Sequence, residues 1–265
     1  MCIILFAYRH HPRYWLVLAA NRDEFYRRPS APAHFWPDQP MLLAGRDLEQ
    51  MGTWLGITRS GRLAALTNYR DPASYRPDAL SRGKLVSGYL GSEQQPRDYL
   101  AAVDRQANEY NGFNLLVGDA TGLWYYSNRH NKVTAVAPGI HGLSNHLLDT
   151  AWPKVAKGCH KLAACLAADD VKEDNLWDIL ADRQPAPDHE LPATGVSREL
   201  ERALSPIFIV TPDYGTRAGT LLLIDYAGNV RFIERTYSPA GDSIATREYI
   251  FKLRLTSGQG FQPIG

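Results

Sequence analysis

The sequence has 265 residues, of which 45% are apolar and 22% are charged, values typical of a soluble globular protein with a sizeable core. Its formal net charge of +1 gives no electrostatic reason to expect nucleic acid or an anionic membrane as the main partner. No linker-like segment divides the chain, so we expect a single domain over residues 1–265.

The first residues carry no signal for export. The apolar run that starts at Cys2 stops at Arg9, which makes it too short for a signal peptide or a membrane span. Three cysteines are too few for a disulfide framework, and Cys159 and Cys165 are expected to be small buried side chains of a helix. The sequence therefore predicts a cytoplasmic protein without a membrane-spanning segment.

Two apolar runs open the chain, residues 2–8 and 14–20, and a polar turn with a proline separates them. This pattern predicts an antiparallel hairpin. The polar cluster Asn21–Glu24 follows the second run directly. Because the two strands run in opposite directions, we expect this cluster at the same end of the hairpin as Cys2.

Cys2 is a candidate nucleophile, since removal of Met1 would place a thiol and a free α-amine on one residue. An α-amine titrates near about 7.7–8.0 and a free thiol near about 8.5, so the amine can accept the thiol proton without a histidine. Asp23 can hydrogen-bond the α-ammonium, and Arg22 can lower the thiol pKa or bind a substrate carboxylate. The alternative is that Cys2 is an arbitrary second residue without a functional role. In this case Asn21–Glu24 form only a strand-end turn that caps the next segment.

Strand-rich and helix-rich parts alternate along the rest of the chain. Residues 26–40 hold four prolines and are expected to form an extended surface loop that can line a pocket. The expected elements then follow in this order: strands 53–58 and 62–68, helices 81–91 and 96–110, strands 113–117, 123–127 and 132–137, helices 151–168, 172–182 and 197–204, and strands 207–211, 218–225, 230–236 and 247–255. This order indicates an α+β fold with mainly antiparallel sheets.

Further candidates for a site stand at strand ends. Asn68 and Asn145 each close an extended segment, where an amide can stabilise a developing oxyanion; a turn asparagine with a positive φ is the alternative. Arg217 precedes a strongly apolar strand and is expected to be paired or to bind an anion. The eight histidines show no metal-ligand spacing and no phosphate-loop motif occurs, so we expect neither a catalytic metal nor a Walker-type nucleotide site.

Six ordered motifs resemble the pattern of the NRDE proteins, the transport and Golgi organisation protein 2 family, which is named for the Asn-Arg-Asp-Glu run. They extend over nearly the whole chain: Met1-Cys2-Ile3, Ala20–Phe25, Gly45-Arg46-Asp47, Gly52–Gly56, Leu66–Arg70 and Tyr214–Arg217. The resemblance implies a four-layer αββα sandwich of the N-terminal nucleophile hydrolase type, similar to penicillin V acylases and bile salt hydrolases.

The resemblance also implies catalytic roles. In that group a cysteine exposed by methionine removal attacks a linear amide, an aspartate holds its amine, asparagines complete the oxyanion hole and an arginine tunes the thiol. By position these roles fall on Cys2, Asp23, Asn68, Asn145 and Arg217. The acylases resemble Arg-Asn-x-Asp in the second strand, whereas this chain has Ala20 where that motif has its arginine.

A second function is implied by the family's links to haem trafficking and to acyl-coenzyme A or lipid handling. In this alternative the protein is a non-catalytic carrier that uses the same pocket, floored by aromatics such as Phe25, Tyr26 and Trp54. The candidate ligand-binding residues are Asn21, Arg22, Glu24, Phe35, Trp36, Tyr69 and Arg70. We therefore expect a small-molecule ligand, which is an acyl amide or thioester, haem or acyl-coenzyme A. No cofactor is required, haem enters only as a bound ligand, and enzymatic activity and oligomeric state stay open.

Overall fold

The structure is a computed structural model that describes residues 3–168, 171–255 and 260–261. Its first sheet consists of β1 (Ile3–Tyr8), β2 (Tyr14–Phe25), β10 (Gly139–Leu143), β11 (Tyr214–Asp225), β12 (Asn229–Tyr237) and β13 (Ser243–Lys252). Its second sheet consists of β3 (Ser30–Trp36), β4 (Gln39–Asp47), β5 (Leu55–Thr58), β6 (Leu63–Asn68), β7 (Phe113–Asp119), β8 (Gly122–Ser127) and β9 (Thr134–Ala135). The α-helices of the described ranges are α1 (Gly83–Leu90), α2 (Pro96–Arg105), α3 (Pro153–Leu166), α4 (Glu173–Leu180) and α5 (Arg198–Ala203).

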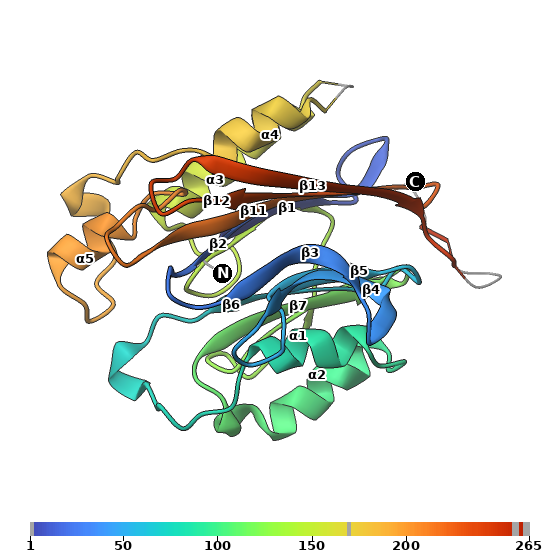
Figure 1. Cartoon of the computed structure of the whole chain (residues 1–265), viewed down its shortest axis with the longest axis horizontal. Helices are drawn as coiled ribbons and strands as arrows, with labels where there is room; N and C mark the ends of the chain where they lie inside the picture. The colour runs from blue at the N-terminus through green and yellow to red at the C-terminus, as the bar shows by residue number, and fades with distance from the viewer. Residues whose placement is uncertain (1–2, 169–170, 256–259, 262–265) are drawn as a thin grey trace.

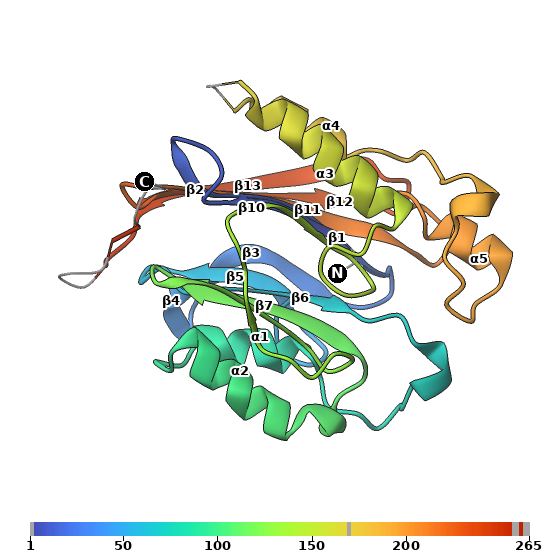
Figure 2. The ribbon, with the colours of Figure 1, turned by 180° about the vertical axis from the view of Figure 1, so that it is seen from behind.

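Strand order in the first sheet is β10-β1-β2-β11-β12-β13, and the second sheet follows the chain from β3 to β9. The paired strands run antiparallel in both sheets. Figures 1 and 2 show the sheets stacked face to face, with α3 and α4 outside the first sheet and α1 and α2 outside the second. The predicted α+β class and four-layer αββα sandwich are confirmed.

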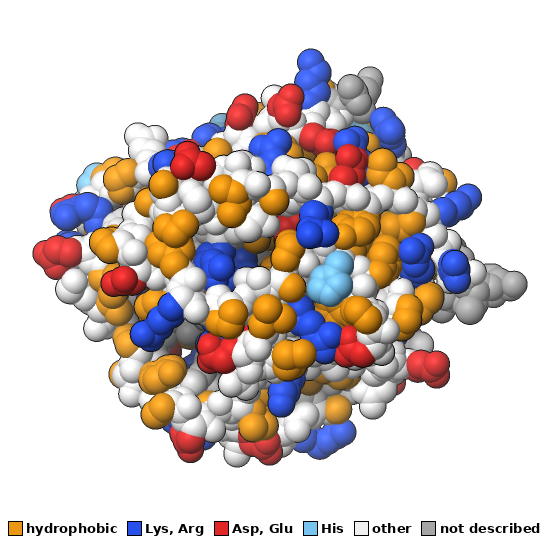
Figure 3. Space-filling model, viewed as in Figure 1, with side chains coloured by type: hydrophobic (Ala, Val, Ile, Leu, Met, Phe, Trp, Pro, Cys, Tyr) orange, Lys and Arg blue, Asp and Glu red, His pale blue; other side chains and the backbone are white. Residues whose placement is uncertain are grey.

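Three apolar layers hold the sandwich together, because alternate side chains of each strand face opposite sides of its sheet. The layer between the sheets joins residues such as Leu18 of β2 to Ile57 of β5. The outer layers pack α3 and α4 against the first sheet and α1 and α2 against the second. Among the described residues, no helix has the length and apolar character needed to cross a bilayer. Acidic and basic side chains are intermixed on the face shown in Figure 3, in keeping with the small net charge.

The predicted N-terminal hairpin is present, with Ile3 of β1 opposite Asn21 of β2. β2 does not end before the polar cluster, as the sequence suggested, but continues through it to Phe25. The reason is β11, which pairs with the other edge of β2 as far as Phe25 opposite Tyr214 and so satisfies the backbone of the polar cluster.

The prediction of an extended loop over residues 26–40 is wrong, because β3 and the start of β4 form a hairpin there. β3 is the edge strand of its sheet, and an edge strand tolerates proline because one side of it needs no ladder donor. Pro32 lies within the register irregularity between Ala31 and His34. The proline content therefore marked an edge strand and its turns.

Three smaller corrections concern other segments. Residues 207–211 form no strand; in this part Val210 makes only an isolated bridge to Gly215, and the Phe208 N–H donates to a loop carbonyl. The glycine-containing strand β10, which the sequence did not predict, pairs with β1. Cys159 and Cys165 are half-buried on α3, because the outer face of this helix is exposed to solvent.

Candidate functional site

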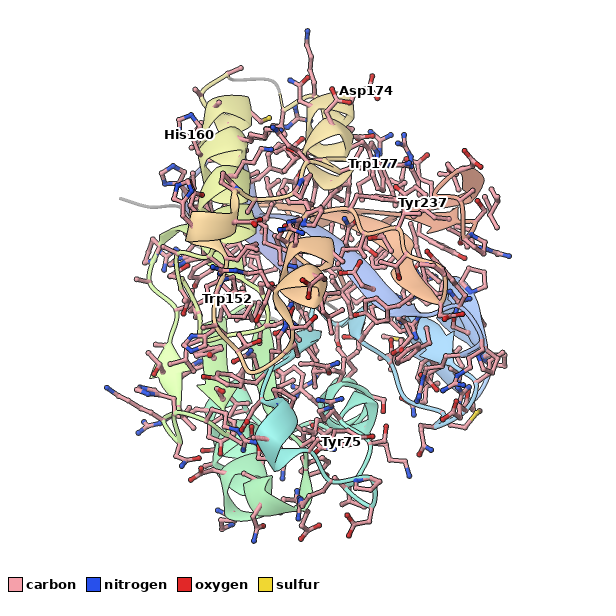
Figure 4. The ribbon with its side chains drawn as sticks, turned by 90° about the vertical axis from the view of Figure 1, so that its left-hand side faces the viewer. Tyr75, Trp152, His160, Asp174, Trp177 and Tyr237 are labelled. Atoms are coloured by element: carbon pink, nitrogen blue, oxygen red, sulfur yellow. The ribbon has the colours of Figure 1, made fainter. Side chains whose placement is uncertain are left out.

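A cavity of about 290 Å³ lies at one end of the sandwich, where β2, β4 and β6 approach one another. Residues of β2, β4 and β6 line one part of its wall. Residues 75–83, which precede and begin α1, and the connection between β4 and β5 line other parts. Figure 4 labels Tyr75 on this segment. The volume is at the small end of the roughly 300–1,000 Å³ usual for small-molecule sites, so the cavity suits a compact ligand or one end of a longer ligand.

The wall of the cavity depends on a close backbone approach between two glycines. A Cβ atom on Gly52 would lie 2.5 Å from the carbonyl carbon of Gly83, so any side chain there would separate the two segments. The N–H of Thr53 donates to the Gly83 carbonyl at 3.2 Å. These contacts bring residues 75–83 against the connection between β4 and β5 and thereby enclose the cavity.

Arg22 is the most unusual side chain of this wall. It is only 4% exposed, and its guanidinium lies over the Trp54 ring with 4.3 Å between the guanidinium carbon and the ring centre. Its Nη2 is 3.8 Å from Asp47 Oδ2 and 4.0 Å from Glu24 Oε2, while the buried Nη1 has no hydrogen-bond partner within the described ranges. Burial lowers the pKa of Arg22, because the charged form loses water. A buried cationic donor without a partner is suited to an anionic ligand group.

Asp47 does not neutralise Arg22, because Arg28 engages it more closely. The Nε of Arg28 donates to Asp47 Oδ2 at 2.6 Å, and its Nη1 donates to Glu49 Oε1 at 3.1 Å. Burial would raise the pKa of Asp47, but the hydrogen bonds from Arg28 and from the Gln50 N–H lower it below its ordinary value. The same ion pair outweighs burial at Arg28 and raises its pKa. Asp47 is thus committed to Arg28, and Arg22 keeps free hydrogen-bonding capacity.

Asp23 lies next to Arg22 in β2 and is 2% exposed. Its Oδ1 accepts a hydrogen bond from the Thr216 hydroxyl at 2.5 Å, whereas its buried Oδ2 has no partner in the part of the chain that the structure describes. The predicted nucleophile Cys2 lies outside the described residues, so its proximity to Asp23 stays a prediction. Ile3, the residue bonded to Cys2, pairs with Asn21 two positions before Asp23.

Asn68 and Asn145 lie next to each other in the structure. The Asn145 Nδ2 donates to the Asn68 carbonyl at 2.9 Å, and the Arg70 N–H donates to the Asn145 carbonyl at 2.8 Å. Asn68 lines the cavity; the buried Asn145 lies behind it. Neither asparagine has a positive φ, so the alternative of a left-handed turn asparagine is wrong for both.

Two of the polar candidates, Asn21 and Arg217, lie away from the cavity wall. The Nδ2 of Asn21 donates to the carbonyls of Leu180 and Ile207, both at 2.9 Å, on the helix side of the first sheet. Arg217 donates through Nη1 to the carbonyls of Phe25 and Arg28, so it is paired, as expected, with backbone. Arg217 therefore ties the end of β2 to the Arg28 segment.

The aromatic candidates also have other partners. Trp36 is 1% exposed, packs beneath α1 and α2, and donates through Nε1 to the Ala44 carbonyl. Phe35 packs edge-on against Tyr249 of β13. The structure does not place Phe35 or Trp36 at the cavity; among the predicted aromatics, Trp54 lines it.

Tyr69 and Arg70 follow β6 but turn away from the cavity. The Tyr69 ring packs against His146, with 4.9 Å between ring centres. The Arg70 Nη1 donates to the buried Glu201 Oε2 at 2.6 Å, and its guanidinium lies over Trp152. These contacts join β6 to the α5 region.

Sequence reasoning missed Arg28, Arg82 and Leu80 as cavity residues. Arg82 and Leu80 belong to a loop segment, and nothing in their spacing indicates that the loop folds back onto β4 and β5. Arg28 stands between Arg27 and Pro29 without a distinguishing pattern. The Gly52–Gly56 motif, which contains the contacting glycine, was the sequence signal nearest to this part of the wall.

Glu234 of β12 is a second unanticipated feature, buried between the sheets at 2% exposure. Its Oε1 accepts a hydrogen bond from the Ala33 N–H at 2.6 Å, which ties β12 to the edge strand β3. Its Oε2 has no partner among the described residues. Burial raises the pKa of Glu234 to about 7, against the opposing effect of the Ala33 hydrogen bond.

Together these features define an αββα sandwich protein with a small, mainly polar cavity at the strand ends. The buried Arg22 and the strand-end Asn68 line this cavity. The described residues contain no cluster of three side chains suited to hold a metal ion.

Comparison with known proteins identifies the family. The family model described as Transport and Golgi organisation 2 matches residues 1–239, and the chain belongs to this family, as its motifs predicted. The Transport and Golgi organization protein 2 homolog of Bos taurus is 40% identical over 259 residues, which cover 89% of this chain and 93% of the relative. The Homo sapiens homolog is 38% identical over 276 residues, which cover 96% of this chain and 100% of the relative.

Among solved structures, the Caenorhabditis elegans N-acylethanolamine-hydrolyzing acid amidase ortholog is similar, with a TM-score of 0.49 and 11% identity. The similarity covers 84% of this chain and 92% of that chain.

Proposed function

We propose that this protein is a cysteine hydrolase of the N-terminal nucleophile type that cleaves a linear amide or thioester carrying an acidic group. The observation that carries the proposal is the buried Oδ2 of Asp23, which has no hydrogen-bond partner in the described part of the chain. A buried carboxylate oxygen without a donor is unfavourable. The α-amino group of Cys2, exposed by removal of Met1, would donate a hydrogen bond to it, and the pairing of the adjacent Ile3 with Asn21 supports this role.

In the proposed reaction the α-amine accepts the thiol proton while the sulfur attacks the carbonyl carbon of the ligand. The protonated amine then gives this proton to the leaving amine or thiol as the scissile bond breaks. Water hydrolyses the resulting thioester, which releases the acid and restores the thiol of Cys2.

In this proposal two residues of the cavity wall bind the substrate. Asn68 is the amide donor to the oxyanion, since its side chain lines the cavity and Asn145 holds its backbone. Arg22 binds the acidic group of the ligand through the unpartnered Nη1. The ring of Trp54 beneath the guanidinium and the side chain of Leu66 offer an apolar surface to the acyl chain.

The test uses an activated acyl thioester as the substrate and intact-mass spectrometry of the same protein. Wild type should turn over the substrate and carry an acyl adduct on mature Cys2, and Cys2→Ala should abolish both. Cys165→Ala, which removes a half-buried helix thiol, is the matched control and should change neither. Turnover by a pool that retains Met1 throughout would reject the amine as the base.

Binding without turnover is the second candidate function, and the buried, unpartnered Arg22 Nη1 favours it because it needs only an anionic ligand group. Haem and acyl-coenzyme A both carry such groups. The test is a titration of wild type, Cys2→Ala and Arg22→Gln with each ligand. Retained affinity in Cys2→Ala, lost affinity in Arg22→Gln and no turnover in wild type would select the carrier over the hydrolase.

A further inference from the structure

Thr216 of β11 joins a backbone donor to the Asp23 carboxylate. β11 lies beside β2 in the first sheet (Figure 1), and Thr216 is 1% exposed. Its Oγ1 accepts a hydrogen bond from the Ile209 N–H at 2.9 Å and donates one to Asp23 Oδ1 at 2.5 Å. Thr216 belongs to the Tyr214–Arg217 motif of the sequence, in which Arg217 was the predicted site residue.

The direction of these two hydrogen bonds is fixed by Ile209. A backbone N–H can only donate, so the single hydrogen of the Thr216 hydroxyl is left for Asp23. Asp23 Oδ1 is therefore the acceptor in its bond to Thr216. The other carboxylate oxygen, Oδ2, is buried and has no partner among the described residues, so it remains the acceptor for a further donor.

A β-bulge at Arg217 turns Thr216 toward Asp23. Arg22 pairs with Ala218, and the next residue, Asp23, pairs with Thr216. Adjacent strand residues face opposite sides of a sheet, whereas residues two apart face the same side. In a regular strand Thr216 would therefore share the face of Ala218 and point away from Asp23. The register shift between Thr216 and Ala218 places the hydroxyl on the Asp23 side instead.

Backbone contacts hold the bulge on both sides. The Arg217 Nη1 donates to the carbonyls of Phe25 and Arg28. The Thr216 N–H donates to the Ile209 carbonyl at 2.8 Å, and Ile209 is itself 1% exposed. The main chain and the hydroxyl of Thr216 are thus both bound by Ile209, which gives the hydroxyl a defined position.

We infer that Thr216 is a positioning residue for the proposed reaction: its hydroxyl orients the Asp23 carboxylate so that Oδ2 accepts a hydrogen bond from the Cys2 amine. The inference rests on the proposed function, in which Asp23 holds this amine. When the amine takes the thiol proton it becomes an ammonium, and an oriented carboxylate beside it stabilises the ammonium–thiolate pair. Loss of the hydroxyl should therefore lower the thiolate fraction of Cys2. Thr216 does not line the cavity, so substrate binding should change little.

The first test is the turnover of an activated acyl thioester. Thr216→Val keeps the shape of the side chain and removes the hydroxyl, and it should lower kcat at least about tenfold, as expected for the loss of a hydrogen bond to a charged group. KM should change little. Thr216→Ser keeps the hydroxyl and should retain nearly the wild-type kcat.

Thr220→Val is the matched control for these variants. It removes a buried hydroxyl from the same strand, but Thr220 pairs with Ala20, which faces the layer between the sheets. This variant should leave kcat unchanged. Far-ultraviolet circular dichroism and urea unfolding verify that each variant is folded. If Thr216→Val does not fold, Thr216→Ala takes its place, because its smaller side chain leaves room for water at the Ile209 N–H.

The second test is the rate at which iodoacetamide alkylates Cys2, measured by mass spectrometry of the digested chain. Alkylation follows the thiolate fraction, so it should be slower in Thr216→Val than in wild type and in Thr216→Ser. Cys159 and Cys165 of α3 are internal references, whose alkylation rates should be the same in every variant.

Alkylation needs no substrate, so the two proposals can fail separately. If wild type turns over no substrate while Cys2 alkylation still depends on the Thr216 hydroxyl, the hydrolase proposal is wrong and the positioning role stands. If wild type is active and Thr216→Val equals it in kcat and in Cys2 alkylation, the positioning role is overturned. Equal losses in Thr216→Val and Thr216→Ser would assign the effect to packing and would overturn it as well.

Discussion

The Arg22 guanidinium carbon lies 4.3 Å from the centre of the Trp54 ring, so an arginine of one sheet rests on an aromatic ring that precedes β5 of the other. A cation held over an aromatic face in this way is stabilised by roughly 0.5–2 kcal/mol. The ring also fixes where the guanidinium points. Because Trp54 covers one face of the guanidinium, its N–H groups extend in the ring plane: Nη2 lies near Glu24 and Asp47, and Nη1 has no hydrogen-bond partner among the described residues.

Arg22→Gln should weaken the binding of an anionic ligand at least about tenfold, since a hydrogen bond to a charged group contributes about 1.5–3 kcal/mol. Isothermal titration with acyl-coenzyme A measures the effect. Arg62→Gln is the control, because Arg62 lies over Tyr89 at 4.0 Å but lines no part of this cavity. Equal losses in the two variants would contradict an anion site at Arg22.

Asp23→Asn should reduce turnover of an activated thioester by roughly a hundredfold or more, in the range expected when a group that supports acid–base catalysis is lost. The amide keeps an acceptor for the Thr216 hydroxyl, so folding stability should change little. Initial rates and urea unfolding of the same preparations separate the two effects. Unchanged turnover would mean that Asp23 does not hold the amine.

Breaking the buried pair between Arg70 and Glu201 should destabilise the fold by about 3 kcal/mol, because the remaining charge is left buried without its partner. Glu201→Gln, followed by urea unfolding, tests this expectation. The matched control is Asp188→Asn, which breaks the exposed pair with Arg202 and should change the stability little, because solvent screens this pair. A similar loss in both variants would show that the burial of Glu201 is not what matters.

Glu234 should make the protein less stable as the pH rises from about 4.5 to about 7. Burial raises its pKa from 4.5 to about 7, so the folded state holds the proton more tightly than the unfolded state does. Stability from this group is complete below the unfolded pKa and is lost as the pH passes the folded pKa. The loss is on the order of 3 kcal/mol.

Glu234→Gln removes this titration while keeping an oxygen to accept the Ala33 N–H. Urea unfolding between pH 5 and 8 should therefore show a flatter pH dependence in this variant, which should exceed wild type in stability at pH 8. Glu248→Gln, at a half-exposed ion pair with Arg231, should keep the wild-type slope. A wild-type slope in Glu234→Gln would assign the pH dependence to other groups.

Local sequence determined much of the fold. Alternating or continuous apolar runs with polar turns between them predicted the N-terminal hairpin, the β5–β6 hairpin and the β7–β8 hairpin, because these pairs are made by residues close in the chain. Helical apolar spacing likewise predicted α1 to α4 to within a few residues at most ends. The helix expected over 96–110 ends at Arg105 instead, and a 3₁₀ turn, Ala107–Glu109, follows it. The ordered motifs predicted the family and, through it, the four layers.

Non-local pairing decided the rest. β2 extends through Asn21–Glu24 because β11, almost two hundred residues later, supplies its second neighbour, and residues 26–40 form a strand because β4 lies beside them. Local propensity carries no information about such distant partners. For residues 26–40 the four prolines therefore predicted a loop.

The site shows the same division. Sequence determined which residue types were present: a cysteine at position 2, carboxylates and arginine at the end of β2, and asparagine at the end of β6. Only the tertiary structure decided that Arg22 faces the cavity while Asn21 binds the carbonyls of Leu180 and Ile207, and that Trp36 is core. The physical reason is that adjacent strand residues point to opposite faces, and which face borders a cavity depends on the elements packed against each side of the sheet.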